Sequence, residues 1–170
     1  TARSSAECSP RLSYPGISPF QIVRNLSLSI QNIIGINKMI EEFFQKVLEL
    51  KNVPRQGWKE KLEIINPESV AEHSYSTAAI SMILSDLEGL NTEKIIKMAL
   101  LHDLAESIIG DIIPDNIAKN EKVRKENIAM KQILKNLPDK IAEPYFEIWN
   151  EYQKNSSQES RLLHDIDKLE

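Results

Sequence analysis

Residues 97–111 read KMALLHDLAESIIGD, and positions 95–109 are apolar almost throughout. A helix formed here would be apolar on all its faces, and such a helix is normally buried in a core. Its centre nevertheless carries His102, Asp103 and Glu106, and buried ionisable groups destabilise a fold unless they are paired, hydrogen-bonded or bound to metal. Because a helix turns by about 100° per residue, His102 and Asp103 can flank one point while Glu106 lies one turn along, beside both. The segment therefore predicts half of a metal site.

Composition places the chain among ordinary single-domain globular proteins. It has 170 residues, of which 41% are apolar and 27% charged, enough for a substantial core. A net charge of −4 offers no basic footprint for polymeric nucleic acid. The lone cysteine, Cys8, cannot form an internal disulfide, and no apolar run reaches the roughly 18–20 residues of a membrane span. We therefore predict a cytoplasmic protein that binds neither polymeric nucleic acid nor a membrane.

The amino-terminal part of the chain differs from the rest. Residues 1–19 are rich in Ser and Pro and show no periodicity. We predict that residues 1–36 are a disordered or non-native segment, within which residues 20–36 form a short helix or, alternatively, a targeting peptide. Residues 37–170 form the folded domain.

Helical periodicity dominates that domain, and no strand pattern is convincing. Ser69 and Glu72 have capping-box spacing, and Gly89, Gly110 and Pro114 are helix-ending signals. Residues 54–58 are expected to be a loop, and Pro144 is expected to interrupt its helix. The fold class is therefore all-α, a bundle of about six helices. The expected ranges are 38–50 (with Ile40, Phe43, Phe44, Val47 and Leu48 in the core), 69–87, 92–109, 119–136 (with Val123 inward), 139–152 and 157–170.

Three histidines are candidates for ligands, and each has a structural alternative. Judged without its neighbours, His73 would be a surface histidine near a capped helix start. Judged in the same way, His102 would be a hydrogen-bonded histidine in the core. The pair His102–Asp103, followed by Glu106 and Asp111 within ten residues, favours a site that holds a cation. His164 is expected to be exposed or to lie behind the ligands.

Five motifs in register resemble a known family. His73, His102–Asp103 and Asp167 match the H…HD…D signature of HD-domain metal-dependent phosphohydrolases. The similarity is closest to the 5′-deoxynucleotidase branch and covers residues 38–170. It rests on the segments RQGW (55–58), NPESVAEH (66–73), HDLAE (102–106), GDI (110–112) and DIDK (165–168).

The resemblance implies an HD-domain helical bundle and hydrolysis of deoxyribonucleoside 5′-monophosphates to deoxynucleoside and phosphate, usually by a homodimer. His73, His102, Asp103 and Asp167 would be the metal ligands. Such a mixed nitrogen and oxygen set suits one divalent transition metal such as Co²⁺, Mn²⁺ or Fe²⁺, with Mg²⁺ also compatible. Four protein ligands leave two positions for water and a phosphate oxygen.

The resemblance also implies roles for residues around the metal. Glu106 matches the acid that holds or deprotonates the nucleophilic water, and Asp111 matches a second active-site acid. Arg55 matches a phosphate-contacting arginine; its alternative is a solvated loop charge. Trp58 matches a tryptophan lining the sugar pocket, with a core or lid anchor as its alternative. Some relatives have this Arg and Trp adjacent, whereas here two residues separate them.

Two further expectations concern the end of the chain and other functions. The chain stops three residues after Asp167, where family members usually continue, so we expect either a C-terminally truncated domain or support from a partner subunit. The alternatives to a 5′-deoxynucleotidase are an HD phosphohydrolase acting on triphosphates or cyclic phosphodiesters, and a non-catalytic helical module that binds a nucleotide or protein. Lys119 or Lys122 could reach a phosphate.

Overall fold

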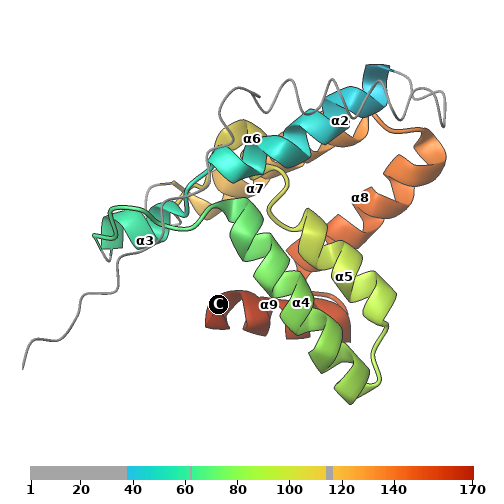
Figure 1. The fold of residues 1–170 in the computed structure, drawn as a ribbon. Helices are drawn as coiled ribbons and strands as arrows, with labels where there is room; N and C mark the ends of the chain where they lie inside the picture. The colour runs from blue at the N-terminus through green and yellow to red at the C-terminus, as the bar shows by residue number, and fades with distance from the viewer. Residues whose placement is uncertain (1–37, 62, 114–116) are drawn as a thin grey trace, which may run out of the picture.

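Only helices and one isolated bridge, between Pro54 and Ser69, occur in the described part of the chain. The structure, a computed structural model, describes residues 38–61, 63–113 and 117–170. Six helices of this part have ten or more residues, which confirms the all-α prediction (Figure 1). In chain order the elements are α2 (Lys38–Glu49), the 3₁₀ helix η1 (Leu50–Asn52), α3 (Gln56–Lys61), α4 (Val70–Glu88), α5 (Thr92–Leu101), α6 (Glu106–Ile109), α7 (Lys119–Leu134), α8 (Asp139–Lys154) and α9 (Gln158–Leu169).

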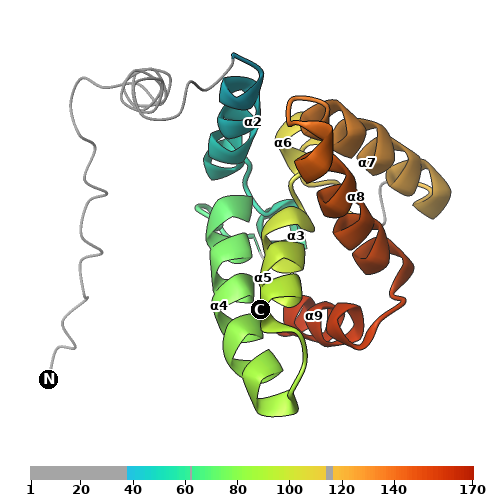
Figure 2. The ribbon, with the colours of Figure 1, turned by 90° about the vertical axis from the view of Figure 1, so that its right-hand side faces the viewer.

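Helices α4 and α5 form an antiparallel pair that sequence signals delimit. Ser69 and Glu72 make the predicted capping box at the start of α4. Gly89 ends α4 with a left-handed backbone (φ 67°), a conformation that glycine adopts without steric cost. The side chain of Asn91 then caps α5 by accepting from the Lys94 amide. The two helices lie side by side in both views (Figures 1 and 2). Residues at the start of α4 and at the end of α5 therefore come together.

Two apolar clusters hold the remaining helices against this pair. One surrounds the fully buried Trp149 of α8 and includes residues of α4, α5 and α7. The other joins α4, α5, α8 and α9 and includes the fully buried Leu163 of α9. In consequence α9 packs against both α4 and α5, and Figure 2 shows it next to this pair of helices. This packing brings the carboxyl end of α9 to the histidine-bearing helices.

The predicted continuous helix over residues 92–109 is wrong. Helix α5 ends at Leu101, residues 102–105 form a tight turn, and the short α6 follows. Within the turn the amide of Glu106 bonds the carbonyl of Asp103 at 2.9 Å, a three-residue spacing. The carbonyl of His102 instead accepts from the indole N–H of Trp149 at 3.2 Å. A hydrogen bond from a distant side chain therefore replaces one backbone hydrogen bond of the helix, which no local sequence pattern could indicate.

Other local expectations also need correction. Residues 54–58 are not all loop, because α3 begins at Gln56 and contains Trp58. Pro144 does not interrupt α8, which continues across it to Lys154; the proline lies in the second turn, where only one backbone bond is lost. Three residues expected in the core are partly exposed: Phe44 (37%), Val47 (41%) and Val123 (37%).

The short helix expected at residues 20–36 falls outside the described residues. None of the described helices is sufficiently long and apolar to cross a bilayer.

Candidate metal centre

The four candidate ligands come from three segments that the fold brings together. His73 lies in the first turn of α4, His102 caps the end of α5, Asp103 opens the turn that follows, and Asp167 lies in the last turn of α9. The Nε2 atoms of His73 and His102 are 3.2 Å apart. Asp167 Oδ1 lies 3.1 Å from the Nε2 of His73 and 3.9 Å from that of His102. Asp103 Oδ2 lies 3.6 Å and 3.1 Å from the same two nitrogens.

Hydrogen bonds on the far side of each ring determine which nitrogen faces the cluster. The Nδ1 of His102 is 2.6 Å from the carbonyl of Ala99, and the Nδ1 of His73 contacts the carboxylate of Glu170. A carbonyl or an ionised carboxylate only accepts, so both Nδ1 atoms carry the proton. In the neutral rings the two Nε2 lone pairs would then face one another at 3.2 Å. That arrangement is repulsive unless a proton on one ring or a metal ion lies between the two nitrogens.

The charges point to the same conclusion. Burial alone would lower the pKa of His102, but the charges of Asp103 and Asp167 raise it to about 9. Burial would raise the pKa of both aspartates, yet the neighbouring imidazoles hold the pKa values of Asp103 and Asp167 below their usual range. Ligands about 2.1 Å from a six-coordinate ion stand about 3 Å apart when adjacent. The donor atoms of His73, His102 and Asp103 lie within 4.8 Å of one another, as expected around one divalent cation, and Asp167 Oδ1 lies within 3.9 Å of both imidazole nitrogens.

Glu106 is buried beside this cluster. It is the first residue of α6, it is 4% exposed, and its Oε2 has no hydrogen-bond partner among the described residues. Burial first, and then the charges of Asp103 and Asp111, raise the pKa of Glu106 to about 10. The carboxyl is therefore protonated at neutral pH in the metal-free protein, and a bound cation would lower its pKa.

Metal binding should accordingly release protons. At pH 7.5, below its pKa of about 9, the metal-free His102 holds a proton that a divalent ion must displace. We expect release of at least one proton per ion at pH 7.5, and progressively less release as the pH rises through 9 and towards 10. Titration calorimetry in buffers of different ionisation enthalpy measures this number. Proton release that stays constant from pH 7 to pH 10 would contradict the expected protonation of His102.

Arg55 and Asp111 lie on the side of the cluster formed by α3. Arg55 Nη1 is 3.6 Å from Asp103 Oδ2, and its Nε is 4.0 Å from Glu68 Oε1. Asp111, in the loop after α6, accepts a hydrogen bond from the backbone amide of Gln56 at 2.7 Å. This bond links the amino end of α3 to the segment that carries Glu106. The negative charge of the carboxylate also interacts favourably with the dipole of α3 at that end.

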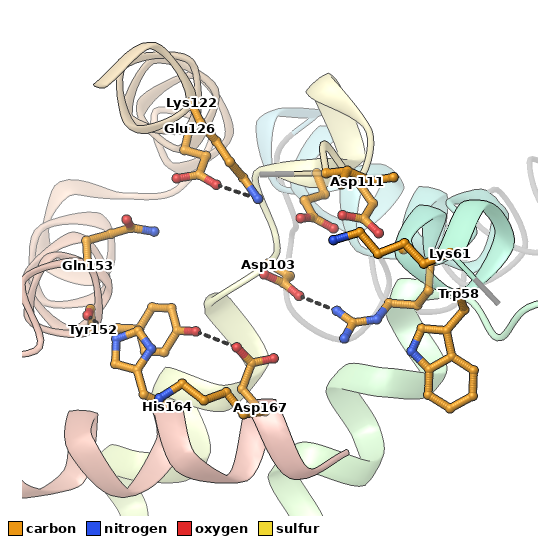
Figure 3. Close-up of a pocket in the computed structure, with 15 residues that line it drawn as sticks. Trp58, Lys61, Asp103, Asp111, Lys122, Glu126, Tyr152, Gln153, His164 and Asp167 are labelled. Atoms are coloured by element: carbon orange, nitrogen blue, oxygen red, sulfur yellow. Dashed lines mark hydrogen bonds and ion pairs between the residues drawn. The ribbon is translucent and has the colours of Figure 1, made fainter. Parts of the chain in front are cut away.

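A cavity of about 650 Å³ lies beside the cluster, and Arg55, Asp103, Glu106, Asp111 and Asp167 are among the residues that line it. Asp103 and Asp167 lie at its centre (Figure 3), Trp58 and Lys61 of α3 form one side, and residues of α7 and α8 form the opposite side. Lys122 of α7 lines it and pairs with Glu126 at 3.7 Å, whereas Lys119 is exposed. The lining residues are Arg55, Gly57, Trp58, Lys61, Asp103, Glu106, Asp111, Ile113, Lys122, Glu126, Tyr152, Gln153, His164, Asp167 and Lys168.

The structure also separates the residues of α9. His164 is partly buried, lines the cavity and stacks on Tyr152, with ring centroids 4.1 Å apart. Asp165 is exposed and pairs only loosely with Lys168, at 3.5 Å. Sequence reasoning missed two contacts to candidate ligands, from Tyr152 to Asp167 and from Glu170 to His73. Glu170 follows Asp167 by three residues and so shares its helix face, a spacing that could have indicated it.

The comparisons with known proteins identify the family. The HD domain family model matches residues 47–170, so this chain belongs to the HD domain family, and the resemblance drawn from the motifs is confirmed. Within that family the chain is 42% identical over 130 residues to human 5′-deoxynucleotidase HDDC2, covering 76% of this chain and 63% of the human protein. It is 40% identical over 136 residues to 5′-deoxynucleotidase hdd1 of Schizosaccharomyces pombe, covering 77% and 68%.

Solved structures give the same picture. The PH0347 protein from Pyrococcus horikoshii is 38% identical, with a TM-score of 0.64 over 75% of this chain and 72% of that one. A predicted metal-dependent phosphohydrolase from Magnetospirillum magnetotacticum is 25% identical, with a TM-score of 0.65 over 78% and 68%. The chain spans less than two thirds of the length of the human, mouse, frog and bovine relatives.

Proposed function

We propose that this chain is the catalytic domain of a 5′-deoxynucleotidase, a metal-dependent phosphomonoesterase that hydrolyses deoxyribonucleoside 5′-monophosphates to deoxynucleoside and phosphate. The observation that carries the proposal is the convergence of two buried imidazoles with two carboxylates, Asp103 and Asp167, that line a cavity together with Glu106 and Arg55. Several relatives that are 37–43% identical are named 5′-deoxynucleotidases, which supports the choice of substrate.

The metal would be held by His73, His102, Asp103 and Asp167. When bound, a divalent ion supplies a Lewis acid for the phosphoryl group and lowers the pKa of a bound water. The mixed donor set favours Co²⁺, Mn²⁺ or Fe²⁺, with Mg²⁺ also compatible. A homodimer belongs to the same proposal and rests on the family resemblance, whereas a cytoplasmic location rests on the single cysteine, Cys8.

The other residues of the cavity have distinct tasks in this reaction. The guanidinium of Arg55 binds the phosphate, since its planar fork matches phosphate oxygens. Glu106 holds and transfers a proton at Oε2, the oxygen that has no other partner among the described residues. Asp111 is already engaged with the Gln56 amide, so we assign it to holding α3 and the substrate in place. Trp58, which is partly buried and lines the cavity, borders the sugar.

The charge balance of the cavity favours a monophosphate over a triphosphate. Among the lining residues four are basic (Arg55, Lys61, Lys122 and Lys168) and five are acidic (Asp103, Glu106, Asp111, Glu126 and Asp167). A bound divalent ion would offset two of the acids. The cavity then offers little positive charge for the additional negative charges of a triphosphate. Its volume of about 650 Å³ is in the range of about 300–1,000 Å³ typical of small-molecule sites.

A substrate panel tests the proposal directly. The purified chain is incubated with Co²⁺ or Mn²⁺ and with deoxynucleoside monophosphates, ribonucleoside monophosphates, deoxynucleoside triphosphates or cyclic nucleotides, and released phosphate and products are measured. We expect phosphate release that is fastest with deoxynucleoside monophosphates and absent in His102→Ala and Asp103→Ala variants. No release above those variants, or preferential formation of other products, would overturn the proposal.

Replacement of Arg55 by alanine should weaken handling of the substrate phosphate. A hydrogen bond to a charged group contributes about 1.5–3 kcal/mol, so kcat/KM is expected to fall by about 10- to 150-fold. Arg124→Ala is the matched control, because Arg124 is exposed on α7 and does not line the cavity. Steady-state kinetics of both variants decide the question. Equal losses in the two variants, or none in Arg55→Ala, would exclude a phosphate contact by Arg55.

A further inference from the structure

The Asp167 carboxylate is held from two directions. Its Oδ1 lies 3.1 Å from the Nε2 of His73, on the side of the ligand cluster. Its Oδ2 accepts a hydrogen bond from the hydroxyl of Tyr152 at 3.1 Å, which Figure 3 shows as a dashed line. Without the phenol, the carboxylate could rotate about its side-chain bonds, because it is about one quarter exposed (26%). The hydroxyl therefore fixes the orientation of the carboxylate, with one oxygen bonded to Tyr152 and the other facing the cluster.

Tyr152 is itself immobilised between two histidines. It is 7% exposed, its ring meets that of His102 nearly edge-on (5.4 Å between centroids, 73° between planes), and it stacks on His164. The Nε2 of His164 is 3.0 Å from the Tyr152 carbonyl, which can only accept, so the imidazole donates. A carboxylate oxygen only accepts, so the Tyr152 hydroxyl donates the proton of its bond to Asp167.

Glu170 acts on His73 in a corresponding way. Its carboxylate contacts the Nδ1 of this fully buried ring, and an oxygen of Glu68 lies within 4.8 Å of the same groups. The negative charge behind the ring places the imidazole proton on Nδ1 and leaves the Nε2 lone pair facing Asp167 and His102. Removal of the carboxylate would allow the ring to exchange tautomers.

We propose that Tyr152 and Glu170 are positioning residues of the metal centre: the phenol of Tyr152 orients the carboxylate of Asp167, and the carboxylate of Glu170 selects the tautomer of His73. The inference rests on the metal centre of the proposed function and not on the reaction or its substrate. Both residues act through a ligand and neither needs to touch the ion. They stabilise different ligands, so their effects on metal affinity should multiply.

Metal affinity measures the proposal without reference to catalysis. Loss of a hydrogen-bond partner behind a ligand typically lowers metal affinity by about 10- to 100-fold, and we expect this loss in Tyr152→Phe and in Glu170→Ala, measured by calorimetry with Co²⁺ and with Mn²⁺. Glu170→Gln keeps an acceptor for Nδ1 but loses the charge, so its affinity should lie between those of Glu170→Ala and the unsubstituted chain. The double variant should show the product of the two losses.

Matched controls separate positioning from a general packing defect. Tyr145→Phe removes a phenol hydroxyl from the same helix, α8, outside the cavity, and Asp165→Asn removes an exposed carboxylate from α9; both should bind metal with unchanged affinity. Imidazole ¹⁵N NMR of the metal-free protein should show His73 as the Nδ1–H tautomer in the unsubstituted chain and a tautomer mixture in Glu170→Ala. The visible spectrum of the Co²⁺-loaded protein should change in Tyr152→Phe.

The outcomes are distinguishable from failure of the proposed function. Metal-free melting temperatures close to that of the unsubstituted chain would show that the variants fold. Unchanged metal affinity in folded Tyr152→Phe and Glu170→Ala, or an unchanged His73 tautomer in Glu170→Ala, would overturn the inference. If the unsubstituted chain binds metal but releases no phosphate, the proposed function fails while the affinity comparison still decides the inference.

Discussion

Replacement of Asp103 by asparagine is expected to abolish both metal binding and phosphatase activity. Asp103 Oδ2 lies 3.1 Å from one imidazole nitrogen and 3.6 Å from the other, and 3.6 Å from the guanidinium of Arg55. Asparagine keeps the shape but removes the charge at this central position. A bound ion contributes several kcal/mol to the transition state, and about 4 kcal/mol corresponds to about 1,000-fold in rate. We therefore expect a loss of phosphate release of at least about 1,000-fold.

The measurement combines calorimetric titration with Co²⁺ or Mn²⁺ and a phosphate-release assay. The control is Asp165→Asn, on the exposed face of α9, which should leave both quantities unchanged. An Asp103→Asn protein that still binds the ion tightly and turns over substrate would show that this carboxylate is not a ligand.

The second large effect concerns Glu106, where activity and stability should change in opposite directions. Glu106→Gln removes a group that holds and transfers a proton, a contribution of about 10²- to 10⁴-fold to the rate. The four candidate ligands are untouched, so metal binding should persist. Phosphate release under saturating metal and substrate is therefore expected to fall by about 10²- to 10⁴-fold, with metal affinity retained.

The stability effect follows from the raised pKa of Glu106. Its pKa in the metal-free folded protein, about 10, lies above the value of 4.5 for an unperturbed glutamate. The folded state therefore binds more protons than the unfolded state between these values, and stability falls as the pH rises from about 4.5 towards 10. Glutamine carries no such penalty. Metal-free Glu106→Gln should melt at a higher temperature than the unsubstituted chain at neutral pH, by a margin that grows up to about pH 10.

Thermal denaturation from pH 5 to pH 10 in the presence of a chelator tests this sign. Near pH 5 the two proteins should differ least, because the loss of stability begins only near the unfolded-state pKa of 4.5 and accumulates as the pH rises above it. A variant that is less stable at every pH would mean that the buried carboxyl makes a hydrogen bond that glutamine cannot replace. If Glu106→Gln kept full phosphate release, a group other than Glu106 would have to carry out the proton transfer.

Much of the helical framework could be predicted because its signals are local. Ser69 with Glu72, Gly89 and Ser157 mark helix ends through bonds to backbone groups a few residues away, and such bonds depend little on the rest of the fold. Met130, Ile133 and Leu134 are buried, as their spacing indicates. Periodicity failed on α2, where Phe44 and Val47 are partly exposed, because a pattern defines an apolar face but not how much of it a neighbour covers.

The residue types of the candidate metal centre were already evident in the sequence: His73, His102–Asp103, Glu106 and Asp167 have imidazole or carboxylate side chains and match the pattern of one family. Only the tertiary structure decided how they are oriented. The indole of Trp149 in α8 donates a hydrogen bond to the His102 carbonyl, which therefore makes no helical bond. Tyr152 donates to one oxygen of Asp167. Glu170, at the end of α9, contacts His73. The physical reason is that a covalent sequence specifies which donors and acceptors exist, whereas their partners here lie 15, 47 and 97 residues away along the chain. The packing of α8 and α9 against α4 and α5 determines which of them meet.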